Sequence, residues 1–102
     1  MDAKIANALS IAKSGGRHHG FYRAWKDKPS REIEKSMRSL RGQIETHQDK
    51  IANPDKYIAE GIPPRQRAGL INRYWPKEIE NFKQELAILE GILRERTHEQ
   101  AS

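Results

Sequence analysis

The sequence contains no cysteine and no long hydrophobic run. Without cysteine there are no disulfide bonds and no cysteine-ligated zinc sites, so the redox compartment cannot be read from the chain. The longest apolar run, Leu86 to Leu89, is far shorter than the ~20 residues that span a membrane. The first twelve residues are interrupted by Asp2 and Lys4 and lack the apolar centre of a signal peptide. We therefore expect neither a membrane span nor a visible targeting signal.

Apolar and aromatic residues are also scarce. Hydrophobic residues make up 35% and aromatic residues 7% of the 102 positions, whereas 32% are charged and the mean hydropathy is −0.95. A chain of this length forms one small domain. Helices that bury one stripe each and leave a charged outer face have this composition, and a compact mixed fold does not.

The clearest predicted helix begins near Ser30 and ends at Asn53. Pro29 is tolerated in a first turn, and Asn53 precedes Pro54, which disfavours helical geometry at that position. Apolar residues and one histidine recur at spacings of 4, 3, 4, 3 and 4, which is a heptad pattern. These seam positions are Ile33, Met37, Leu40, Ile44, His47 and Ile51.

A second heptad pattern follows a loop over residues 53–64. A short helix is expected from Arg65 to Tyr74, with Leu70, Ile71 and Tyr74 facing inward. Pro76 fits either the first turn of a new helix or a kink between two joined helices, and we favour the new helix. The second seam is formed by Trp75, Ile79, Phe82, Leu86, Leu89 and Leu93.

Two seams of similar length predict an all-α fold, an antiparallel two-helix hairpin with one or two additional short helices. The hairpin covers residues 30–96 and follows a basic segment, 15–31, within a single helical domain of residues 15–102. Residues 1–14 form either a docked short helix or a leader. The alternative is a parallel, self-associated coiled coil. A hairpin alone leaves apolar surface uncovered, so a third element or another protein is expected against it.

The positive charge is concentrated at the start of the chain. Residues 1–31 hold seven of the 19 Lys and Arg residues but only two of the 14 acids, so the rest of the chain is neutral. This segment also contains the sequence Arg-His-His-Gly-Phe-Tyr-Arg-Ala-Trp-Lys. A neutral body with one cationic segment suggests an anionic partner, of which nucleic acid is the commonest.

Histidines beside arginines can cleave a phosphodiester without a metal. Such a reaction needs a general base, a general acid and a cation beside the developing negative charge. The candidate catalytic residues are His18, His19 and Tyr22. Neighbouring histidines point apart on a regular element, so we expect one of them to be central. The candidate nucleic-acid-binding residues are Arg17, Arg23, Trp25, Lys26, Lys28 and Arg31. For Phe21 and Trp25, packing against the hairpin is the stronger alternative.

Other positions give weaker signals. His47 lies on an apolar seam, where a histidine is more often a core or partner-facing residue than a ligand. No metal site or cofactor is expected, because the acids are spaced as helix-surface charges and no phosphate-cradling glycine motif is present. Arg65 and Arg67 form a second basic spot after Pro63-Pro64.

Four stretches within residues 16–96 resemble the C-terminal effector domains of bacterial polymorphic toxins of the Rhs and filamentous-haemagglutinin types. The most specific is the His-x-x-Lys-Ile-x-Asn-Pro helix end with a Trp-Pro about twenty residues later. The resemblance implies a small domain delivered into the cytoplasm of a target cell and neutralised in the producer by a cognate immunity protein. It also implies nuclease activity, since many such domains are nucleases. The stretches are Gly20-Phe21-Tyr22, Glu32-Ile33-Glu34-Lys35, His47–Pro54 and Trp75–Ile79.

The residues together favour a metal-independent ribonuclease. One alternative is a non-enzymatic helical module that binds nucleic acid or a protein. Another is an effector whose target is a protein or a membrane surface, although a neutral body argues against membranes. Toxicity on induced expression, relieved by a neighbouring gene product, would separate an effector from an adaptor.

Overall fold

The computed structural model describes residues 3–101, with side chains for residues 3–99, so the first two residues of the predicted 1–14 segment and residue 102 lie outside it. Its described part is all-α, as the sequence predicts, and none of its helices is long and apolar enough to cross a membrane. The elements are α1 (Ala3–Ala6), α2 (Ala8–Lys13), α3 (His19–Trp25), α4 (Ser30–Ala52), a 3₁₀ turn (Pro54–Lys56), α5 (Pro64–Gly69), a π-helical turn (Leu70–Tyr74) and α6 (Trp75–Ala101).

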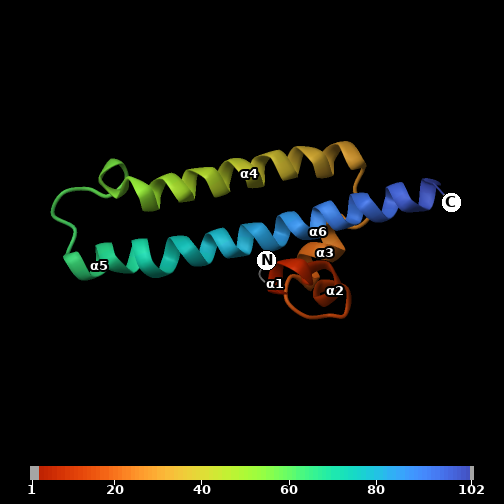
Figure 1. Ribbon diagram of the computed structural model, residues 1–102, viewed down its shortest axis with the longest axis horizontal. Coiled ribbons are helices and arrows are strands. Elements are labelled where there is room, and N and C mark those ends of the chain that lie inside the picture. Colours follow the sequence, from red (N-terminus) through yellow and green to blue (C-terminus); the bar gives the residue numbers. More distant parts are fainter. Residues whose placement is uncertain (1–2, 102) are drawn as a thin grey trace.

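Helices α4 and α6 form the predicted antiparallel hairpin (Figure 1), in a molecule of 58 × 25 × 24 Å. Four of the six α4 seam positions are buried, namely Ile33, Met37, Leu40 and Ile44. On α6, the facing seam buries Trp75, Ile79 and Leu89. A heptad pattern keeps one stripe of each helix against the other, which is why the spacing alone predicted this pairing.

The prediction that a new helix begins at Pro76 is wrong, because α5, the π-helical turn and α6 form one continuous helix (Figure 1). In the π-helical turn, the Trp75 N–H donates to the Leu70 carbonyl, five residues back. A wider turn accommodates the ring of Pro76, which lacks an N–H and would clash in a regular α-helix. The added residue places Trp75 inward and leaves Tyr74 58% exposed, so the inward orientation expected for Tyr74 is also wrong.

Helices α1, α2 and α3 cover a second side of α6 near its C-terminal half (Figure 1). Ala8 and Ala12 are buried together with Ile88 and Ile92, which lie outside the heptad seam of α6. The N-terminal residues therefore form a docked helical unit, one of the two alternatives left open for them. This unit supplies the third element that the hairpin requires.

Gly91 allows α2 to approach α6 closely. A Cβ atom at Gly91 would lie 2.5 Å from Leu9 Cδ2 and 3.4 Å from Leu9 Cβ. The Leu9 methyl can rotate away from one added carbon, and alanine gains about 1 kcal/mol of helix propensity over glycine. A larger side chain has to displace α2 itself.

We expect Gly91→Leu to lower the free energy of unfolding by about 1–3 kcal/mol, the usual effect of overpacking, whereas Gly91→Ala stays near wild type. Urea unfolding measures both variants. Adding Leu9→Ala to Gly91→Leu should recover part of the loss, because it removes the opposing side chain. Wild-type stability of Gly91→Leu would contradict this close packing.

Asp49 organises the loop at the far end of the hairpin. Its carboxylate accepts hydrogen bonds from Tyr57 Oη (2.5 Å), Lys56 Nζ (3.0 Å) and Asn53 Nδ2 (2.7 Å). The bond from Tyr57, then those from Lys56 and Asn53, lower the pKa of Asp49 to about 2. The same contact raises the pKa of the Tyr57 hydroxyl.

We expect these contacts to be lost only in strong acid. Since the folded-state pKa of Asp49 lies below its ordinary value of 3.8, its contribution to stability is complete above about pH 4 and disappears as the pH falls through about 2. An NMR titration of the Asp49 carboxyl measures this. Asp49→Asn should also return the Tyr57 pKa toward its ordinary value of 10.0. A midpoint near 3.8 for Asp49 would contradict the Tyr57 contact.

Candidate nucleic-acid interface

Within the basic segment, a constrained residue immediately precedes α3. His18 has a φ of 68°, in the left-handed region that non-glycine residues rarely adopt. Its Nε2–H donates to Gln84 Oε1 on α6 at 2.8 Å. Gln84 is only 2% exposed and also donates to Glu80 Oε1 at 3.4 Å. His18 therefore satisfies a buried polar group and fixes the entry into α3.

We expect His18→Ala to lower the free energy of unfolding by about 1–3 kcal/mol, because Gln84 Oε1 would be left buried without a donor. Gln84→Leu added to His18→Ala should recover much of this loss, since removing both partners of a buried hydrogen bond is far less costly. Chemical denaturation of the two single variants and the double variant measures their coupling. Strictly additive losses would show that the His18–Gln84 bond contributes nothing.

His19 points to a different element from His18, as expected for neighbouring histidines. Its Nδ1–H donates to the Ala12 carbonyl at the end of α2 at 2.8 Å. Each imidazole thus uses one ring nitrogen as a hydrogen-bond donor to a protein acceptor. The other nitrogen, Nδ1 of His18 and Nε2 of His19, has no hydrogen-bond partner among the described residues. One lone pair on each ring is therefore left for a proton.

The aromatic residues of α3 pack against the core. Phe21, Tyr22 and Trp25 are half-buried against the hydrophobic cluster, and the rings of Phe21 and Trp25 lie 6.0 Å apart at an angle of 39°. Phe21 and Trp25 therefore pack against the hairpin, the stronger alternative expected for them. Tyr22 acts electrostatically on the Lys13 amine, which also pairs with Glu95 and whose pKa is raised mainly by that Glu95 bond. Tyr22 thus lies within electrostatic range of Lys13, whereas His18 is hydrogen-bonded to Gln84.

The predicted cations fall into two groups along α6. Arg17 Nη2 donates to Asn81 Oδ1 at 2.5 Å, beside His18. The turn between α3 and α4 is held further along, where Arg96 donates to the Lys26 carbonyl at 2.9 Å and to Ser30 Oγ at 3.0 Å. Asn81 and Arg96 are about 22 Å apart along the helix axis. The structure therefore does not gather the predicted basic residues at one point.

The second group carries most of the free charge. Lys26 pairs with Asp27 at 3.6 Å. The three remaining cations are exposed, and within the described part of the chain none of them is paired with a carboxylate; they are Arg23, Lys28 and Arg31. Unpaired cations near one turn attract a polyanion more strongly than cations already neutralised. We name these three residues the turn cations.

Glu85 is a candidate that the sequence analysis missed. Burial raises the pKa of its carboxyl, and the His18 imidazole acts against this shift. Glu85 follows Gln84 in α6, and its carboxyl lies within electrostatic range of the His18 imidazole. The signal in the sequence is the spacing of Asn81, Gln84, Glu85 and Ile88, a second helical stripe beside the heptad seam.

Two other predicted positions have defined surroundings. His47 packs edge-on against the Phe82 ring, with centroids 5.2 Å apart, and contacts Glu78 Oε2 at 2.5 Å. Its Nδ1–H donates to the Gln43 carbonyl at 2.9 Å. His47 therefore packs between the two helices of the hairpin, as expected for a core histidine. Arg67 pairs with Asp55 at 2.8 Å, which neutralises half of the second basic spot.

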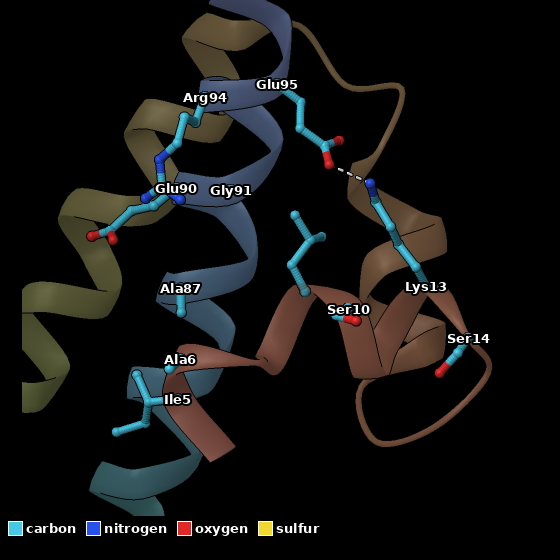
Figure 2. A pocket seen from close by; sticks show the side chains of 11 residues that line it. Ile5, Ala6, Ser10, Lys13, Ser14, Ala87, Glu90, Gly91, Arg94 and Glu95 are labelled. Carbon is cyan, nitrogen blue, oxygen red and sulfur yellow. Dashed lines mark hydrogen bonds and ion pairs between the residues drawn. The ribbon is translucent and has the colours of Figure 1, made fainter. Parts of the chain in front are cut away.

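A large hollow lies outside the basic segment. A groove of about 810 Å³ runs between α2 and α6 (Figure 2), with Lys13 and Glu95 paired across one end. None of the predicted site residues lines it, and its walls mix acids and bases, including Glu90 and Arg94. The groove contains neither the histidines nor the unpaired cations of the basic segment, so we do not place the functional site there.

Comparisons with protein-family models, curated proteins and solved structures gave no match to this chain. Within the described residues, no three His, Asp or Glu side chains gather as a metal site would require.

Proposed function

We propose that this chain is a helical module that binds nucleic acid, with RNA as the favoured partner, and that it acts as a toxin effector domain. The observation that supports binding most directly is the set of turn cations, exposed and without a carboxylate partner beside a turn that Arg96 holds in place. Arg17, bonded to Asn81, supplies a separate cation further along α6. A cognate immunity protein and action in the cytoplasm of a target cell belong to the same proposal, supported by the resemblance alone.

Fluorescence anisotropy with a labelled single-stranded RNA tests binding. We expect affinity to fall linearly on a log–log plot against salt concentration, with a slope of about −0.7 for each phosphate contact. An affinity that does not change with salt, or no affinity at low salt, would refute a phosphate-directed interface. Induced expression in bacteria, with and without the neighbouring gene product, tests the effector assignment separately.

Metal-independent RNA cleavage is the second candidate, favoured by His18, whose Nδ1 has no partner among the described residues, and by the partly buried Glu85 carboxyl within electrostatic range of it. In this reaction His18 Nδ1 accepts the proton of a ribose 2′-hydroxyl, whose oxygen attacks the phosphorus. Protonated Glu85 gives its proton to the departing 5′-oxygen, and Arg17 stabilises the added negative charge. The raised pKa of Glu85 favours the protonated acid that this step needs.

Incubation with total RNA in EDTA tests cleavage. We expect Glu85→Gln to abolish cutting, whereas His19→Ala, which lies outside this pair, keeps it. The His18→Ala/Gln84→Leu double variant should be inactive although folded, which separates the chemical role of His18 from its structural one. Intact RNA with the wild-type protein would leave the binding module as the function.

A further inference from the structure

The continuous helix α5–α6 has an unusual charge pattern at the end remote from the basic segment. Residues 61–77 contain four Lys or Arg residues and no acid, although acids are interspersed along the rest of α6. Arg67 is paired with Asp55, but among the described residues Arg65, Arg73 and Lys77 have no carboxylate partner. This part of the helix is therefore a second cationic surface.

An exposed aromatic ring lies within this surface. Tyr74 is 58% exposed, more than any other large hydrophobic residue that the structure describes. The ring lies against Gly69, where an added Cβ would be 3.9 Å from Tyr74 Cε2. A shallow hollow of about 530 Å³ is lined by Tyr74 and Gly69 together with Arg65, Leu70 and Arg73.

The π-helical turn is what brings these groups together. It ends at Tyr74 and turns this ring outward while Trp75 enters the core. Such turns depart from regular geometry and are frequent at functional sites. A second hollow of about 420 Å³ is also lined by Arg65, Gly69 and Arg73, so the same two arginines flank both hollows.

We propose that this surface, formed by Arg65, Gly69, Arg73 and Tyr74, binds single-stranded nucleic acid. A base stacks on the free side of the Tyr74 ring, and Arg65 and Arg73 contact the flanking phosphates. Stacking requires an unpaired base, so the inference names a single strand as the ligand, and in this respect it rests on the proposed function. Arg73 and Arg96 are separated by about 34 Å along the helix axis, so the surface is distinct from the turn cations.

Anisotropy with a labelled single-stranded RNA of about 10 nucleotides, within the usual site size, tests the proposal. Tyr74→Ala should weaken binding by about 5–150-fold, the effect of removing one stacking platform, and Tyr74→Phe should bind like wild type. Arg65→Gln/Arg73→Gln should reduce the salt slope by about 1.4. The control is Tyr57→Ala, which removes a tyrosine at the same end of the hairpin whose hydroxyl is tied to Asp49.

The outcomes separate this inference from the proposed function. RNA binding that depends on the turn cations but not on Tyr74 overturns the inference and leaves the function. Binding that depends on Tyr74 but not on the turn cations supports the inference and removes the first interface. Equal affinity for the duplex form of the same RNA, or saturation of the Tyr74 surface by polyglutamate in place of RNA, overturns the inference. No binding at all refutes both.

Discussion

Leu89→Ala is expected to lower the free energy of unfolding by about 2–5 kcal/mol, the range for removing a buried leucine side chain. Leu89 is completely buried in the cluster that joins α4 to α6 and the N-terminal helices. Single domains are stable by only about 5–15 kcal/mol, so this one truncation removes a large part of the total. Urea unfolding followed by circular dichroism measures it.

Leu86→Ala is the matched control. Leu86 lies on the same seam but is only half-buried, so its truncation removes less buried surface and leaves less of a cavity. We expect a clearly smaller loss, with the denaturant slope unchanged in both variants because the fold is the same. Equal losses at the two positions would show that the hairpin does not bury Leu89 as described.

The hairpin could be predicted because the apolar residues that hold its two helices together recur with a heptad period. Ile33, Met37, Leu40 and Ile44 are buried as their spacing requires, and a loop with three prolines and one glycine separates the two seams. Periodicity reports which residues share one face of a helix. It gives no information about a second partner on another face, so the docking of α1 and α2 against Ile88 and Ile92 was left open.

The π-helical turn could not be predicted from local rules. Proline near a helix start fits a new helix as well as the continuation of the preceding one, and the deciding feature is the bond from the Trp75 N–H to the Leu70 carbonyl, which the sequence does not display. The site shows the same limitation. The cationic character of residues 17–31 can be recognised from the sequence. The partner of His18 cannot, because it is Gln84, 66 residues away. The raised pKa of Glu85 likewise depends on burial, which a sequence does not display.

Neutralising the turn cations in the triple variant Arg23→Gln/Lys28→Gln/Arg31→Gln is expected to abolish most RNA binding. Three lost phosphate contacts reduce the salt slope for a single strand by about 2. Extrapolated from 1 M salt, where counterion release contributes nothing, this corresponds to about 500-fold lower affinity at 50 mM salt. Stability should change little, since these side chains are exposed and unpaired within the described structure.

A triple variant of equal net charge, Arg38→Gln/Arg41→Gln/Lys83→Gln, distinguishes a local interface from general attraction. These residues are exposed on the long helices, and among the residues that the structure describes only Arg41 of the three has a carboxylate partner, Glu90, at 3.5 Å. If RNA is held by the overall charge alone, both triple variants lose the same affinity, and the turn between α3 and α4 has no special role. If Arg96 holds this turn so that its cations act together, the first variant loses far more, and Arg96→Ala weakens binding although the turn cations themselves remain.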